Sequence, residues 1–171
     1  LLLSVGLIPE NELSKGAGVA IDPVTGGAVV DERRETSVPG VFACGNVLHV
    51  HDLVDNVSVE AMLAGASAAA YAAGGGGGEA GYYTVAAKDA VRYVVPQRIR
   101  KDAKGKIDLY FRVDNAYRDA AVEVLSGDQV ILRRRRPIVT PGEMEKVAID
   151  AEKLRADAAV RLVGKGGAPC G

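Results

Sequence analysis

The pattern of apolar and polar positions changes along the chain and separates two regions. In residues 1–73, short apolar runs are interrupted by Gly and Pro. This region ends in an alanine-rich segment, residues 58–73, which predicts a helix because alanine has the highest helix propensity. From residue 82 onward, short runs that alternate apolar with polar residues are separated by turn residues, a pattern typical of β-strands.

A run of five glycines at residues 74–78 lies between the two regions. Glycine maximises backbone freedom and buries no side chain, so residues 74–81 are expected to form a flexible linker. The predicted organisation is a first domain over 1–73, a second domain over 82–165 and a tail over 166–171.

The second region predicts a small all-β antiparallel sandwich. Strands are expected at residues 91–95, 107–113, 121–125, 129–133, 144–149 and 159–163. Turn signals separate these strands, for example Lys104-Gly105 and Thr140-Pro141-Gly142. We find no catalytic constellation in this region.

The first region predicts short strands and one helix. Residues 1–5 are expected to form a buried strand, residues 19–21 and 28–30 a hairpin, and residues 41–43 a strand that ends at Cys44. The following helix is expected to be capped by Asp55, Asn56 or Ser58, since their side chains accept hydrogen bonds from a helix start.

Charge and cysteine usage narrow the functional classes. The net charge of −1 argues against a nucleic-acid binder, and no apolar run is long enough for a membrane span. Residues 1–5 have neither an initiator Met nor a charged flank, so we expect the chain to be a piece of a longer protein. Cys44 and Cys170 form no CxxC or zinc spacing, which favours a reducing, cytoplasmic location.

The segment over residues 36–46 carries the candidate chemistry. A turn leads into the apolar strand 41–43, which ends at Gly45 and the polar Asn46. A glycine at this point lets a ligand approach the backbone, and a polar side chain can bond a sugar or ribityl hydroxyl. The start of the next helix favours an electron-rich group, so these parts predict one wall of a cofactor groove.

This segment resembles the second FAD motif of the pyridine nucleotide-disulfide oxidoreductase superfamily, in which a Thr, an apolar-aromatic-Ala strand and a Gly-Asp pair follow in order. Residues 4–11 resemble the segment that precedes this motif, a Gly followed by a Pro-Asn pair. Residues 45–55 resemble a bacterial branch that accompanies glycerol-3-phosphate dehydrogenase-like flavoproteins. The implied fold is an α/β remnant of a flavoprotein with two dinucleotide-binding domains, so that residues 1–73 are the C-terminal part of an FAD-binding domain.

The resemblance assigns cofactor contacts to particular residues of this chain. Asn46 stands where the family usually has the Asp that bonds the ribityl chain. The backbone amides of the following helix would face the electron-rich edge of the flavin. The residues implied in FAD binding are Thr36, Gly45, Asn46, Val57, Ser58 and Val59.

By the same resemblance, the parent enzyme takes a hydride from NAD(P)H onto FAD and passes electrons to a second acceptor, for example a partner flavoprotein or acceptor subunit. The sequence contains no GxGxxG, so the fragment alone is expected to be inactive. The alternative is that the β-rich region is a non-catalytic docking module for a partner subunit. Apolar faces left open by truncation also predict self-association of the fragment.

His49, His51, Asp52 and Asp55 form a cluster that allows three interpretations. An HxH pair with a carboxylate suits a metal ion, a flavin-adjacent histidine suits proton handling, and both histidines suit a hydrogen-bonded structural role. We predict no metal site and name His51 as the catalytic candidate. Residues 133–136 are four consecutive arginines, which a strand would divide between its two faces, as on a solvated edge strand. The alternative interpretation is that these arginines bind an anionic partner.

Overall fold

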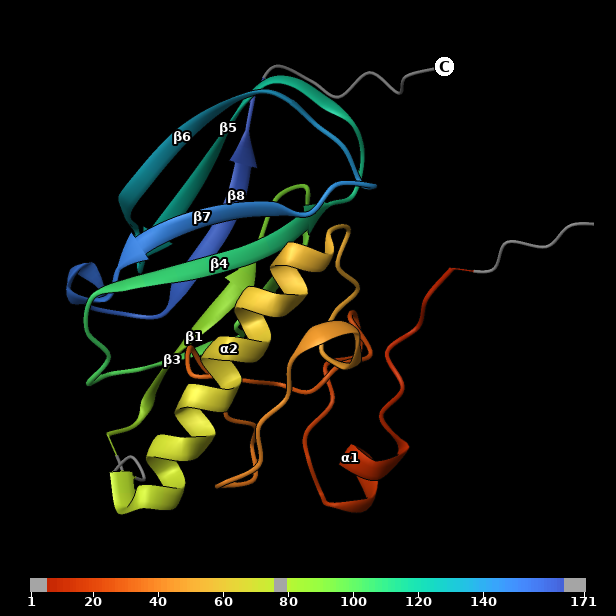
Figure 1. Cartoon of the computed structure of the whole chain (residues 1–171). Coiled ribbons are helices and arrows are strands. Elements are labelled where there is room, and N and C mark those ends of the chain that lie inside the picture. The colour runs from red at the N-terminus through yellow and green to blue at the C-terminus, as the bar shows by residue number, and fades with distance from the viewer. Residues whose placement is uncertain (1–5, 76–79, 165–171) are drawn as a thin grey trace, which may run out of the picture. The chain divides into compact units, whose positions relative to one another are not determined.

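The chain folds into two compact units, Leu1–Gly77 and Gly78–Gly171. The boundary between them along the chain falls in the glycine-rich stretch where the linker is predicted. The structure is a computed structural model, and it describes residues 6–75 and 80–164 (Figure 1). The predicted strand over 1–5 and the predicted tail lie outside these residues. Each unit is described separately below.

Unit 1 is built mainly of turns and helices in the part that the structure describes. Its helical elements are α1 (Glu12–Gly16), the single turn η1 (Gly45–Val47), α2 (Val54–Ala70) and η2 (Tyr71–Gly75). Strand pairing among the described residues of this unit is limited to isolated bridges. The bridge Ile21↔Ala28 confirms the predicted hairpin, and the bridge Glu35↔Phe42 places the predicted strand 41–43 against the turn before it.

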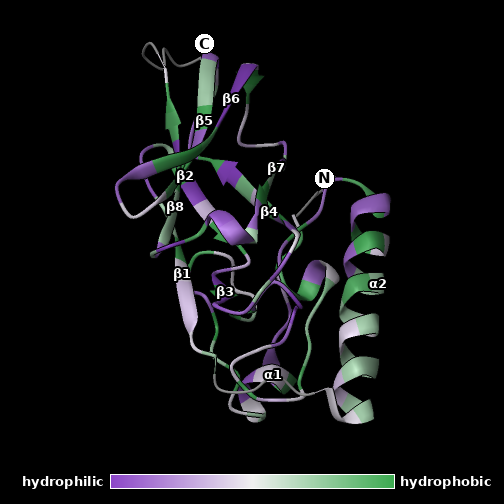
Figure 2. Cartoon of the chain, turned by 90° about the vertical axis from the view of Figure 1, so that its left-hand side faces the viewer, coloured by the Kyte–Doolittle hydropathy of each residue, from purple (hydrophilic) through white to green (hydrophobic). Residues whose placement is uncertain are grey.

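The helix α2 begins at Val54, before the predicted start at residue 58. Its N-cap is Leu53, with no side-chain cap, so the prediction of capping by Asp55, Asn56 or Ser58 is wrong. These residues lie inside the helix instead, because the extended backbone of Leu53 already ends the preceding loop. Figure 2 shows α2 in green and white along most of its length, as its alanine-rich sequence requires.

Unit 2 consists of eight strands. They are β1 (Tyr82–Ala87), β2 (Val91–Val95), β3 (Arg98–Arg100), β4 (Lys106–Val113), β5 (Tyr117–Ser126), β6 (Gln129–Val139), β7 (Glu145–Asp150) and β8 (Ala158–Val163). All six predicted strands are present, and β1 and β3 are additional. The hairpin between β5 and β6 turns at Gly127, whose φ of 58° is easy only for glycine.

The strands form a five-stranded sheet in the order β3-β1-β8-β5-β6 and a three-stranded sheet in the order β2-β4-β7. The pairing is antiparallel except between β1 and β8, which run parallel. The prediction of a purely antiparallel arrangement is therefore wrong at this pair. The missed strand β1 explains the difference, since it enters the sheet between β3 and β8 instead of pairing with its successor β2.

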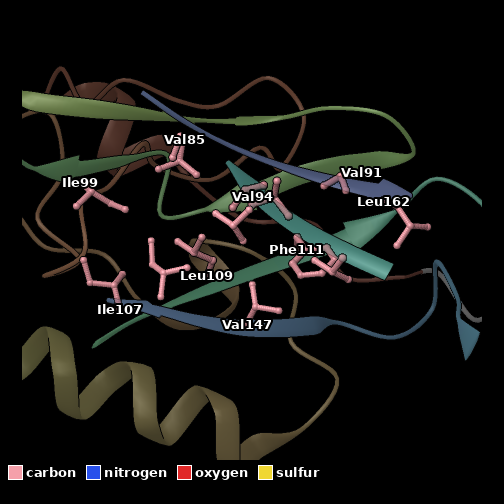
Figure 3. Packing of buried hydrophobic residues seen from close by; sticks show 14 of the residues in the cluster. Val85, Val91, Val94, Ile99, Ile107, Leu109, Phe111, Val147 and Leu162 are labelled. Carbon is pink, nitrogen blue, oxygen red and sulfur yellow. The ribbon is translucent and has the colours of Figure 1, made fainter. Parts of the chain in front are cut away.

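The core of unit 2 lies between the two sheets and contains aliphatic side chains with one phenylalanine (Figure 3). Leu109 and Phe111 on β4 are fully buried in it, as are Val122 and Val124 on β5. Alternate residues of β5 and β8 face this core, and the residues between them face the opposite side of the five-stranded sheet. The sheet therefore has an inner apolar face and an outer face that carries charged residues.

The core predicts a large penalty for a cavity at its centre. We expect Leu109→Ala to lower the free energy of unfolding of unit 2 by about 3 kcal/mol, because the side chain is removed from a close-packed position. Urea unfolding followed by tyrosine fluorescence measures this, since five of the six tyrosines lie in unit 2. The control is Val130→Ala, at a position that is 41% exposed, and equal losses in the two variants would contradict the assignment of the core.

Candidate functional site

The segment between the strand-like residues 41–43 and helix α2 is a loop in which some residues are buried and others are exposed. We call residues 45–51 the site loop. Gly45, Leu48, His49 and His51 are buried, whereas Asn46 is exposed. The loop therefore presents one polar side chain outward and is held from behind by its other residues.

The buried side of the site loop is organised around Glu60 of α2, whose side chain is inaccessible to solvent. Arg34 donates to its carboxylate from Nε at 2.8 Å, and the amide of Gly45 donates at 2.8 Å. The Nε2 atoms of His51 and His49 lie 2.9 Å and 3.4 Å from its oxygens. One carboxylate thus connects the helix, the site loop and the turn that contains Arg34.

The surroundings of Glu60 decide its ionisation. Burial alone would raise its pKa, but hydrogen bonds from His49 and His51 and the charge of Arg34 hold that pKa far below its ordinary value. Burial lowers the pKa of His49, against the opposing effect of Glu60. Glu60 is therefore the anion of the cluster, Arg34 its fixed cation, and His49 is neutral near pH 7.

A strained turn carries Arg34 into the cluster. Arg34 has a φ of 68°, which is uncommon for a residue with a side chain, and the residue is only 2% exposed. The side chain of Asp31 supports this turn by accepting from the amides of Arg33 at 2.9 Å and Glu35 at 3.0 Å. The ion pair with Glu60 offsets part of the cost of this conformation and of burying a guanidinium group.

Two further contacts hold the site loop from the side of the predicted hairpin. The side-chain amide of Asn11 donates to the carbonyl of Val47 at 2.7 Å and to that of Gly26 at 2.9 Å. A Cβ atom at Gly27 would collide with the backbone carbonyl of Leu48, so only glycine allows this close approach. The loop is thus fixed by backbone contacts as well as by Glu60.

Asn46 is the polar group that the site loop exposes. Its Oδ1 accepts a hydrogen bond from the backbone amide of His51 at 3.1 Å. This bond distinguishes the oxygen of the side-chain amide from its nitrogen, Nδ2, which does not take part in it. Among the described residues, that nitrogen has no hydrogen-bond partner in the protein. Asn46 can therefore donate to a ligand while its oxygen closes the loop.

The other predicted cofactor contacts have structural positions. Thr36 is buried, and its hydroxyl exchanges hydrogen bonds of 3.2 Å with the backbone of Val38. Gly45 has a φ of 73° and packs near Val57, while Ser58 donates back to the carbonyl of Val54 at 3.2 Å. Val59 is exposed on α2.

The start of α2 changes which amides are open. Because the helix begins at Val54, the amides of Val57, Ser58 and Val59 fall beyond its first three positions, where helical hydrogen bonds form. The amide of Asn56 bonds to the carbonyl of Leu53 at 3.1 Å. The helix-start donors that face no helical acceptor are those of Val54 and Asp55.

The predicted histidine cluster is brought together only in part. His49 and His51 lie on the same side of the loop, with ring centroids 4.3 Å apart. Asp52 and Asp55 are exposed, and the group of ligand atoms within 4.8 Å of one another consists of those of His49, His51 and Glu60. The sequence reasoning missed Glu60 and Arg34, although Glu60 is the only charged residue between positions 56 and 78, a signal that its side chain has a buried partner.

His49, His51 and Glu60 also satisfy the spacing of a metal site, since their ligand atoms lie within 4.8 Å of one another. The positive charge of Arg34 on the same carboxylate opposes a second cation, and the amide of Gly45 occupies another lone pair. The donor set therefore favours a hydrogen-bonded cluster over a metal ion. Burial raises the pKa of the Cys44 thiol, and Glu60 adds to this effect, so the thiol form is favoured over the reactive thiolate.

Comparison with known proteins bears on unit 1. Residues 1–70 match the model of the family described as pyridine nucleotide-disulphide oxidoreductase. The match supports an oxidoreductase of this superfamily, whose members generally bind flavin and nicotinamide nucleotides. It contains the whole site loop and Glu60, and it ends before unit 2.

No curated protein and no solved structure matches the chain. Among the described residues, no helix has the length and apolar character needed to cross a membrane.

The buried cluster predicts that Glu60 is essential for the stability of unit 1. We expect Glu60→Gln to cost about 3 kcal/mol of unfolding free energy, because it removes the negative charge from the buried ion pair with Arg34. Urea unfolding followed by far-ultraviolet circular dichroism reports on α2. Glu12→Gln on the exposed side of α1 removes the same charge and should have little effect, and a similar loss in both variants would contradict the role of Glu60.

The cluster also predicts a pH dependence. The pKa of His49 is lowered in the folded state, so its contribution to stability is complete above the unfolded value of about 6.5 and is lost as pH falls from there toward the folded pKa. We expect nuclear magnetic resonance to show the His49 ring titrating at lower pH in the folded chain than in urea. Titration at the same pH in both states would disprove the burial of a neutral His49.

Proposed function

We propose that unit 1 supplies one wall of the FAD site of an oxidoreductase that takes a hydride from NAD(P)H and passes electrons to a second acceptor. The observation that carries the proposal is the site loop. Within a segment that matches a flavin- and nicotinamide-binding family, it presents the amide of Asn46 outward on a backbone held by Glu60. When bound, FAD supplies the electron-transfer chemistry that side chains lack.

Asn46 is proposed to bind the ribityl chain of FAD. Its side chain is exposed, and its nitrogen remains available after its oxygen has accepted from the amide of His51. A ribityl hydroxyl needs one hydrogen-bond partner and can accept from this nitrogen. Asn46 therefore suits the position in which the resembled family has Asp, without the negative charge.

The start of α2 is proposed to face the electron-rich part of the flavin. The open amides belong to Val54 and Asp55, and the helix dipole adds a partial positive charge at this end. Negative charge that accumulates on a reduced flavin would be stabilised by these donors. The proposed backbone contacts are therefore the amides of Val54 and Asp55, in place of those of Val57, Ser58 and Val59 that the sequence predicts.

His51 is proposed to act as a positioning residue for the site loop. Its ring is directed at Glu60, its backbone amide holds Asn46, and the residue is only 8% exposed. A group in this position sets the orientation of Asn46 more directly than it reaches a substrate. The proposed site thus separates the groups that touch the cofactor from the groups that hold them.

A titration of FAD with the purified chain tests the proposal, with flavin fluorescence and the visible absorption band as readouts. We expect saturable binding that Asn46→Ala weakens about tenfold, the effect of losing one hydrogen bond of average strength. Asn46→Asp should retain binding, because aspartate keeps the acceptor for the loop and for a ribityl hydroxyl.

The matched control is Asn115→Ala, which makes the same substitution at an exposed position of unit 2. It should leave FAD binding unchanged. Absence of saturable binding, or equal affinity of the Asn46→Ala variant and the original chain, would contradict a flavin contact made by this loop.

A further inference from the structure

A groove of about 830 Å³ in unit 2 is lined by residues of β5 and β6 and by the end of β8, all in the five-stranded sheet. Its charged lining consists of Arg118, Asp119, Arg133, Arg135 and Arg136. Ala121 and Val163 contribute small and apolar surface to it. Arg133 and Arg136 are paired with Glu123 and Glu145, so the positive character of the groove comes from Arg118 and Arg135.

Three residues that lie opposite one another on β6, β5 and β8 show how a carboxylate binds on this sheet. Glu123 on β5 lies opposite Arg133 on β6 and Arg161 on β8. Its two oxygens lie 3.1 Å from the guanidinium of Arg133 and 2.8 Å from that of Arg161. Within unit 2, a glutamate side chain thus lies between two arginines on this sheet.

The neighbouring set of paired residues, two positions along β5, also contains an arginine but no carboxylate. Ala121 on β5 takes the position that corresponds to Glu123, and it lies opposite Arg135 on β6 and Val163 on β8. Arg135 and Arg118 are exposed, and no carboxylate of the described residues lies within ion-pair distance of either. The short side chain of Ala121 leaves the space that Glu123 fills two positions along β5.

The fourth arginine of the groove has other surroundings. Arg136 is paired with Glu145 on β7 at 2.7 Å, and it donates to the carbonyl of Lys146 at 3.1 Å. It therefore connects the two sheets and has little freedom to bind a ligand. The groups available to a ligand in the groove are the guanidinium groups of Arg118 and Arg135.

We propose that this groove is a docking site for an acidic segment of a partner protein. A glutamate or aspartate of the partner enters above Ala121 and pairs with Arg135 and Arg118, as Glu123 pairs with Arg133 and Arg161. Arginine suits this role because its planar group binds a carboxylate through two parallel hydrogen bonds. Asp119 at the same groove rejects segments whose acidic groups are placed differently.

This proposal concerns unit 2 and does not depend on flavin binding by unit 1. The β-rich region, for which the sequence suggests a docking role, would bind its partner through the arginines of this groove. The surface is a sheet face with charged side chains, so specificity comes from the spacing of acids along the partner.

The test uses the full chain and a fluorescent peptide of alternating glutamate and serine, observed by fluorescence anisotropy. The neutral counterpart with glutamine in place of glutamate is measured in parallel, as is inorganic pyrophosphate. We expect the acidic peptide to bind saturably and the neutral peptide not to bind. Arg135→Gln and Arg118→Gln should each weaken binding about tenfold, the effect of losing one charge-assisted hydrogen bond.

Two further variants sharpen the test. Ala121→Glu places a carboxylate inside the groove and should block the acidic peptide while every arginine is kept. Arg92→Gln removes an exposed arginine of β2 in the other sheet and should change the affinity by less than about twofold. Urea unfolding of each variant shows whether unit 2 is intact, and if Ala121→Glu does not fold, the two arginine variants decide.

Three outcomes would overturn the proposal. The acidic peptide does not bind, or it binds as well to the Arg135→Gln variant as to the original chain. The loss in Arg92→Gln equals the loss in Arg135→Gln, which would indicate attraction to total charge. Pyrophosphate binds and depends on Arg118 and Arg135 while the two peptides are indistinguishable, which would assign the groove to a small phosphate-bearing ligand.

Discussion

A carboxylate that is removed from water requires donors on every side, and this requirement determines the arrangement of unit 1. Glu60 lies on a helix with few other buried side chains, yet it joins three separate parts of the chain through Arg34, Gly45 and the two histidines. The energy of such a cluster is not large in total, because desolvation offsets much of the attraction. Its effect is on specificity, since few other loop conformations satisfy the same set of donors.

The sequence predicts those features that depend on local pattern. The alternation of residues in unit 2 predicts six of its strands. The short strand β3 and the parallel entry of β1 were missed, because strand partners are chosen by the tertiary fold. Glu60 was missed for the same reason, since no local pattern indicates that a turn near residue 34 supplies its counter-charge.

Helix starts show how a local rule can be overridden. Asp55, Asn56 and Ser58 are good capping residues, yet Leu53 takes the N-cap position without a side-chain bond. The loop before the helix is held by contacts with Glu60, Asn11 and Gly27, and the extended backbone of Leu53 leads from it into the helix. The result is a helix start with open donors, which suits a bound electron-rich group better than a capped start does.

The parallel pairing of β1 with β8 has a consequence for how unit 2 folds. The two strands come from opposite ends of the unit, and the amide of Thr84 donates to the side chain of Asp157, 73 residues away. Contacts between such distant positions require a large loss of chain entropy before they form, and folding slows as their share increases. During synthesis, β1 emerges long before β8, so the five-stranded sheet cannot close until nearly the whole unit has left the ribosome.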